Sequence, residues 1–289
     1  MAQRKTVRSR RLGNQIRRLR DDAQLSQEKL VELMNAEQPQ QRRISAAHLS
    51  RVESGGARIT SEHLERIATV LGVDTEQAGT LDELRRRADE RGWWQEYSDI
   101  VTEEVEMLVE IGEDATTARS YDIAFVQGLL QTRAYAEAVI GNDRAFVSPI
   151  NVDRMAELRM RRQHRLGEDG FQGLTAVLTE GVIRTQVGGR DVLRDQLRHL
   201  LEVTQRYPVT IHILPFSAGA LPGSENFVIF EFPDKLDGDV VYVDSHTAQR
   251  IYEDRHPVRQ CTYIFNAALA QALPARESQD LIRAVMEEL

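Results

Sequence analysis

The 289-residue sequence has a single cysteine, Cys261, and only 6% aromatic residues. One thiol cannot form an internal disulfide or a thiolate metal cluster, so we expect a reducing, cytoplasmic and nucleoid-associated setting. No stretch approaches the roughly 18 consecutive apolar residues that a membrane span requires. The basic N-terminus is not followed by the apolar run of a secretory signal. We therefore expect a protein with no membrane partner.

Motifs for catalysis are also scarce. Gly188 and Gly189 precede a predicted helix, but their spacing fits neither type of glycine-rich phosphate loop. His246 and His256 are ten residues apart, and no other histidine or cysteine stands at metal-ligand spacing. Asp244 and His246 lie close in sequence, but a catalytic triad is defined by geometry and not by adjacency. We expect no enzyme, no cofactor and no metal, with a hydrolase acting through Asp244 and His246 as the enzymatic alternative.

Positive charge is concentrated at the start of the chain. Residues 1–80 hold 14 basic and 10 acidic side chains, whereas the rest holds 23 basic and 35 acidic ones. The first 20 residues contain eight basic side chains and no acidic one. A basic arm of this kind suits phosphate contacts, whereas the acidic remainder will not bind nucleic acid over its whole surface. A solvated basic tail is the alternative.

The most informative stretch predicts two short helices with an irregular turn between them. Ser26 and Ser45 are N-cap candidates, because a serine hydroxyl accepts an amide hydrogen bond from the first helical turn. Leu49 and Val52 form the inward side of the second helix, and Gly55 supplies the left-handed residue that ends it. This layout is typical of a helix-turn-helix, whose second helix enters the DNA major groove. A helical bundle that contacts protein instead of DNA is the alternative.

Four segments in order, LGNQIRRLR, LSQEKL, ISAAHLSRVESG and HLERIATVLGV, resemble the Xre/Cro-type family of five-helix DNA-binding domains over about residues 10–80. The resemblance implies that Arg51 reads a base, since a guanidinium can grip guanine O6 and N7 together. Ala46 and Ala47 offer only methyl contacts, so much of the specificity is expected to be indirect. The positions expected at the DNA are Gln27, Arg42, Arg43, Ser45, Ala46, Ala47, Ser50, Arg51 and Arg58.

The resemblance also implies a structural ion pair between Arg20 and Glu53, which would tie the first helix to the end of the third. The chain departs from the family between Asn35 and Ile44, where NAEQPQQRRI replaces a turn of a few residues. Pro39 ends any helix that would continue through it. Two interpretations stay open: the loop adds phosphate contacts through Arg42 and Arg43, or it is a tolerated surface insertion.

The remainder of the chain predicts two further parts. Residues 81–168 show a helical pattern and form an expected connecting or dimerisation segment. Within it the helix RMAELRMRRQHRL (154–166) is either a second nucleic-acid surface or an exposed helix paired with acidic neighbours. Residues 169–289 contain the runs LTAVLTE, VTIHILPF, NFVIFEF and DVVYVDS, which predict strands. The expected fold is therefore multidomain: an all-α DNA-binding domain over 1–80, a helical middle, and an α/β (α+β) signal-receiving domain.

A second set of segments, WWQEY, GLLQTRAYA, RMRRQ, ILPFSAGALPG and VVYVDS, resembles the actinobacterial WhiJ-like family over nearly all of the chain. One departure is Gln127, where that family usually has proline. The resemblance implies a transcriptional regulator whose C-terminal domain receives its signal from a small partner protein, commonly encoded nearby. We expect a homodimer on double-stranded DNA, because one recognition helix buries too little surface for high affinity. The alternative is a small-molecule ligand, with the loop Ser217–Asn226 as its lid.

Overall fold

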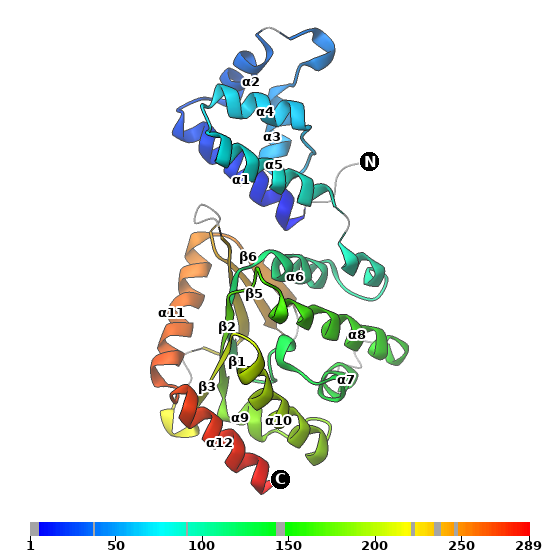
Figure 1. The fold of residues 1–289 in the computed structure, drawn as a ribbon, viewed down its shortest axis with the longest axis vertical. Helices are drawn as coiled ribbons and strands as arrows, with labels where there is room; N and C mark the ends of the chain where they lie inside the picture. The colour runs from blue at the N-terminus through cyan, green and yellow to red at the C-terminus, as the bar shows by residue number, and fades with distance from the viewer. Residues whose placement is uncertain are drawn as a thin grey trace. The chain divides into compact units, whose positions relative to one another are not determined.

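The computed structural model describes residues 6–36, 38–90, 92–142, 148–220, 223–233, 238–245 and 248–289. The chain folds as two compact units, an N-terminal unit (Met1–Trp93) and a C-terminal unit (Trp94–Leu289) (Figure 1). A largely helical first part and middle, followed by a sheet with helices, confirm the multidomain fold class expected from the sequence.

The described residues of the N-terminal unit form five α-helices. Each begins after a side-chain oxygen that accepts an amide hydrogen bond from its first turn, which satisfies a donor that the helix itself leaves free. These capping residues are Thr6, Ser26, Ser45, Thr60 and Asp74. The helices pack around one apolar cluster that includes Ile16, Leu30, Leu49, Ile67 and Leu81. Their bounds are α1 Val7–Asp22, α2 Gln27–Asn35, α3 Ala46–Glu53, α4 Ser61–Val70 and α5 Thr75–Asp89, and a short 3₁₀ helix, η1, spans Gln40–Arg42.

The C-terminal unit is built on one six-stranded mixed sheet with the strand order β3-β2-β1-β4-β5-β6. The strands β1, β2 and β3 run parallel to their neighbours among these three, and β4, β5 and β6 add to the other side of β1 in antiparallel pairs. The strand bounds are β1 Thr117–Asp122, β2 Gly173–Thr179, β3 Val209–Leu214, β4 Asn226–Glu231, β5 Val240–Ser245 and β6 Ala248–Tyr252.

Helices cover both faces of this sheet, with α11 along one face and α6, α8 and α10 on the other (Figure 1). The face under α11 is apolar, because Tyr121, Val241 and Val243 pack there against Phe265. Alternate residues of a strand point to opposite faces, so Ser120 and its neighbours in register point to the other side. The α-helices are α6 Glu103–Asp114, α7 Arg133–Asn142, α8 Val152–Arg162, α9 Glu180–Arg184, α10 Arg190–Arg206, α11 Arg255–Gln271 and α12 Ala275–Glu288. The 3₁₀ helices of this part of the chain are η2 Trp93–Tyr97, η3 Gly128–Leu130, η4 Pro149–Asn151, η5 Gln163–Gly167 and η6 Phe216–Ala218.

Two strands differ from the sequence expectation. The segment Thr117–Asp122 lies in the middle part, which was expected to be helical, yet it forms β1 at the centre of the sheet. The segment Ala248–Tyr252 forms the edge strand β6, which the sequence pattern did not indicate. The middle of the chain is thus mostly helical and also supplies a central strand.

Candidate nucleic-acid interface

The helix α3 presents one open face. The hydroxyl of Ser45 accepts the amide of His48 at 3.1 Å and so begins the helix. Leu49 and Val52 are buried in the core of the unit, which leaves the opposite face to solvent. The residues of this face, from partly to fully exposed, are Ala46, Ala47, Ser50 and Arg51. Within the described chain the guanidinium of Arg51 has no hydrogen bond or ion pair, so it can bind a ligand without first breaking one.

A tight turn ends α3. Gly55 has φ +70°, and its amide donates to the carbonyl oxygen of Val52 at 2.9 Å. The amide of Gly56 donates to the carbonyl oxygen of Arg51 at 2.7 Å, which completes a Schellman motif. The ring Nε2 of His48 lies 3.1 Å from the carbonyl oxygen of Arg58 and ties α3 to the chain that follows. The orientation of α3 is therefore fixed by His48 in its first turn and by the turn that follows its last residue.

The helix α1 packs closely against the C-terminal end of α3. A Cβ atom added at Gly13 would lie 2.4 Å from the carbonyl oxygen of Val52 and 2.6 Å from that of Glu53. Only glycine allows the two backbones to approach this closely. The guanidinium of Arg17 donates to the carbonyl oxygen of Glu53 at 3.2 Å, and the hydroxyl of Ser9 donates to that of Gly55 at 3.0 Å. The C-terminal end of α3 is thus held against α1.

Arg20 and Glu53 meet in the interior of the N-terminal unit. The Nε and Nη2 of Arg20 donate to the two carboxylate oxygens of Glu53 at 2.7 and 3.0 Å. Glu53 is only 1% exposed. The side-chain amide of Gln27 donates to the same carboxylate at 2.6 Å, so one of its two N–H donors is already used. Gln27, one of the positions expected at the DNA, therefore has its second N–H and its side-chain carbonyl oxygen left for any such contact.

The long turn between α2 and α3 is closed at its base by one side chain. The amide nitrogen of Asn35 donates to the carbonyl oxygen of Ile44 at 2.8 Å, and its oxygen accepts the amide of Ile44 at 3.1 Å. Arg66 of α4 donates to the carbonyl oxygen of Arg42 at 2.9 Å, so the loop is anchored on both sides. The side chains of Arg42 and Arg43 are exposed beside α3. The insertion therefore ends at Ile44, which is buried in the core directly before the N-cap Ser45.

The expected basic arm is mostly helix. Arg8, Arg10 and Arg11 lie within α1, which begins at Val7, and Arg8 donates to the carbonyl oxygen of Arg87 at 3.3 Å. Arg4 and Lys5 lie outside the described residues. Arg58 forms an exposed ion pair with Asp89 at 3.0 Å, which a phosphate group would have to replace. Exposed pairs of this type contribute about 0–1 kcal/mol, so that exchange is not costly.

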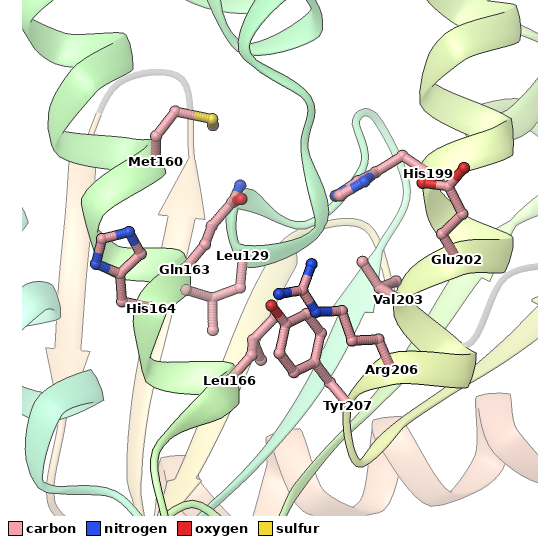
Figure 2. A pocket seen from close by; sticks show the side chains of 10 residues that line it. All are labelled: Leu129, Met160, Gln163, His164, Leu166, His199, Glu202, Val203, Arg206 and Tyr207. Atoms are coloured by element: carbon pink, nitrogen blue, oxygen red, sulfur yellow. The ribbon is translucent and has the colours of Figure 1, made fainter.

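The C-terminal unit contains a pocket of about 360 Å³ between α8, η5 and α10 (Figure 2). His199 projects into it from α10, with its Nε2 atom buried and without a hydrogen-bond partner, and burial lowers the pKa of this imidazole. Within the described chain, none of the loop Ser217–Asn226, the expected lid, lines this pocket. The lining residues are Leu129, Met160, Gln163, His164, Leu166, His199, Glu202, Val203, Arg206 and Tyr207.

The residues that could take part in catalysis are only partly described by the structure. His246 lies outside the described residues, so the pairing of Asp244 with it has no geometry here. Burial raises the pKa of the Cys261 thiol, which disfavours the reactive thiolate. Among the described residues, no group of three or more His, Cys, Asp or Glu side chains could hold a metal ion. No helix in the described part of the chain is both long and apolar enough to span a membrane.

Comparison with known families assigns both units. A helix-turn-helix domain model matches residues 11–81, which covers α1 to the first half of α5. A model of a domain of unknown function, DUF5753, matches residues 105–284, more than half of the chain. The protein belongs to the DUF5753 family. Its DUF5753 domain runs from α6 into α12 and includes the whole sheet. No curated protein and no solved structure matches this DUF5753 protein.

Proposed function

We propose that this protein is a sequence-specific DNA-binding transcriptional regulator that reads its operator with α3. The observation that supports this most is the open face of α3, where small and polar side chains flank one unpaired guanidinium. Short side chains let a helix approach the floor of the major groove closely, and a free guanidinium can bind guanine there without first losing a partner. The match of this unit to a helix-turn-helix domain supports the same role.

The exposed side chains around α3 take different parts in this proposal. Arg51 reads a guanine, and Ala46 and Ala47 contact the methyl groups of bases. Hydroxyl and guanidinium groups hold the flanking phosphates, and the remaining specificity comes from the deformability of the DNA. The phosphate-binding set is Arg42, Arg43, Ser45, Ser50 and Arg58, with Gln27 beside it at the start of α2.

We also infer that the protein acts as a homodimer on an inverted repeat. A single helix-turn-helix buries too little surface for a tight operator complex, and two-fold pairing places the half-sites about one helical turn apart. Control passes through the DUF5753 domain, and a small partner protein is the favoured source of the signal. The pocket of Figure 2 supports a second source, a small molecule, because the buried and unpartnered Nε2 of His199 offers a specific polar contact.

Selection of duplexes from a random pool by the full-length protein tests the DNA-binding part. The Arg51→Ala variant should lose about 1–3 kcal/mol of discrimination at one base pair of each half-site. The matched control is Arg86→Ala, which removes an exposed arginine on α5 and should leave the preferred sequence unchanged. If the wild-type protein enriches no sequence, the proposal is wrong. If Arg51→Ala enriches the same sequence with equal stringency, α3 reads DNA without Arg51.

Genome-wide occupancy in the source cell, measured before and after deletion of any small gene that neighbours its own, tests the control step. Peaks that share a palindrome and change when the neighbour is deleted would support the partner protein. Peaks that ignore the deletion would favour a small molecule. A metabolite that fits the pocket should then raise the melting temperature of the wild-type protein but not of His199→Phe.

A further inference from the structure

The arginines of α8 and η5 fall into two groups. Three of them reach carboxylates: Arg154 pairs with Asp99 at 2.6 Å, Arg161 with Glu96 at 3.0 Å and Arg165 with Glu168 at 2.6 Å. This part of the helix is therefore neutralised by acidic neighbours, which is one of the two interpretations that the sequence left open. Arg159 and Arg162 differ, because neither forms an ion pair with any carboxylate of the described chain.

Arg159 and Arg162 are three residues apart on α8, so they lie on the same face of the helix. Arg159 lies against Gly128 of η3 and donates to the side-chain oxygen of Gln131 at 2.8 Å. Gln131 is only 3% exposed, and its own amide nitrogen donates to the carbonyl oxygen of Val126 at 2.6 Å. Arg162 has no hydrogen bond to any described residue. The two guanidiniums have five N–H donors each, and among the described residues their one hydrogen-bond acceptor is the Gln131 oxygen that Arg159 uses.

The strand β5 supplies the group that faces them. Val241 and Val243 point to the apolar side under α11, so Tyr242 points to the side of α8. Tyr242 is 4% exposed, and its hydroxyl has no hydrogen bond within the described chain. Burial raises the pKa of Tyr242, and the charges of Arg162 and Arg159 act on it in the opposite direction. The phenol thus lies on the sheet face that α8 covers (Figure 1), and the two guanidiniums act on it electrostatically.

Both arginines are half-buried. Partial removal of a cation from water is unfavourable unless a partner compensates, and two cations side by side also repel each other. Burial lowers the pKa of Arg159, and burial followed by the charge of Arg159 lowers the pKa of Arg162 to about 10, so Arg162 remains charged at neutral pH. Asp244 acts on both electrostatically but makes no ion pair with either one. Glu113 also acts on Arg162 electrostatically, and no carboxylate of the described chain forms an ion pair with either arginine, so the cluster has more N–H donors than acceptors.

We propose that Arg159, Arg162 and Tyr242 form a binding site for the phosphate or carboxylate group of a small anionic molecule. A planar guanidinium binds either group through two parallel hydrogen bonds, and the phenol adds a third donor. The site is distinct from the pocket of Figure 2, whose lining residues include none of these three. The inference goes beyond the proposed function and does not depend on DNA binding, because its test measures the anion alone.

The test is thermal unfolding of the full-length protein in inorganic phosphate, in citrate and in chloride at equal ionic strength. Phosphate, citrate or both should raise the melting temperature in a saturable way. The variant Arg162→Met should lose this shift, with affinity for the anion reduced more than tenfold. In chloride alone Arg162→Met should melt no lower than the wild type, because it removes a charge that has no partner.

The matched control is Arg161→Met, which removes the neighbouring arginine that pairs with Glu96 and should keep the anion response. Tyr242→Phe removes one hydroxyl and keeps the ring, so it tests the site if Arg162→Met does not fold. A response to phosphate alone would identify a phosphorylated ligand, and a response to citrate alone a carboxylate. Equal shifts in all variants, no shift in the wild type, or a shift with duplex DNA only would overturn the proposal.

Discussion

Replacing Arg20 by methionine should destabilise the N-terminal unit more than replacing Glu53 by glutamine, although the two residues form one ion pair. Arg20→Met leaves a carboxylate that is 1% exposed, with Gln27 as its remaining close partner and Arg17 3.6 Å away. Loss of one partner from a buried pair costs about 3–5 kcal/mol, because the other charge stays buried. We expect a cost in this range.

After Glu53→Gln, Arg20 keeps more hydrogen-bond partners than Glu53 keeps after Arg20→Met. Its guanidinium still donates to Asp21 at 2.6 Å and to the carbonyl oxygen of Leu25 at 2.8 Å, and the new amide oxygen replaces one carboxylate oxygen. The loss is then close to one charge-assisted hydrogen bond, about 2 kcal/mol. The double variant Arg20→Met, Glu53→Met removes both charges and should be less destabilised than Arg20→Met alone.

Hydrogen exchange of the full-length protein measures these costs. Amides of α1 and α3 should exchange on the order of 100-fold faster or more in Arg20→Met and about 30-fold faster in Glu53→Gln, while amides of the sheet stay unchanged as an internal control. Equal acceleration in the two variants, or a larger effect of Glu53→Gln, would refute the reasoning from the remaining partners.

Three more outcomes follow from the same structure. Gly13→Ala should destabilise the N-terminal unit by about 1–3 kcal/mol through its clash with α3, whereas Gly79→Ala in α5, with open space at its Cβ, should stabilise it by about 0.5–1 kcal/mol; equal exchange rates in both would contradict this. Asn35→Ala should cost about 1–3 kcal/mol and weaken operator binding, since it opens the loop that sets α3; unchanged affinity would separate the loop from docking. Burial raises the pKa of Asp122 to about 8, so its contribution to stability is complete below the unfolded pKa near 4 and is lost as the pH rises to about 8. Urea unfolding should show that Asp122→Asn removes a slope of about 1.4 kcal/mol per pH unit over that window, and parallel profiles would exclude Asp122 as the source.

The helix-turn-helix was predictable because its signals are local. The caps at Ser26 and Ser45 and the left-handed Gly55 each depend on residues within one turn of the chain, so the sequence pattern contains them in full. The outward face of α3 follows from the same periodicity. The anchoring of the long turn was not predictable, because the hydrogen bonds from Asn35 to Ile44 join residues nine apart that only the folded loop brings together.

The central strand β1 was missed because its polar residues find distant partners. TARSYD has no clear alternation of apolar and polar residues, which is the usual signal of a strand. The Nη2 of Arg119 pairs with Glu231 at 2.7 Å and with Asp239 at 3.3 Å, both far along the chain. Ser120 donates to Asp122 at 2.7 Å within the strand itself. The same limit applies to α8, where sequence spacing shows basic residues but not which of them face the sheet.

The position of β1 has a consequence for any attempt to cut the protein. This strand pairs with β2 on one side and with β4 on the other, so it joins the parallel half of the sheet to the antiparallel half. A fragment that begins at residue 169 would keep both halves but lose the strand between them. Each half would then expose a long apolar edge, and such edges recruit strands from other molecules and aggregate. A soluble fragment of this region must therefore start before α6, close to residue 94, where the compact unit itself begins.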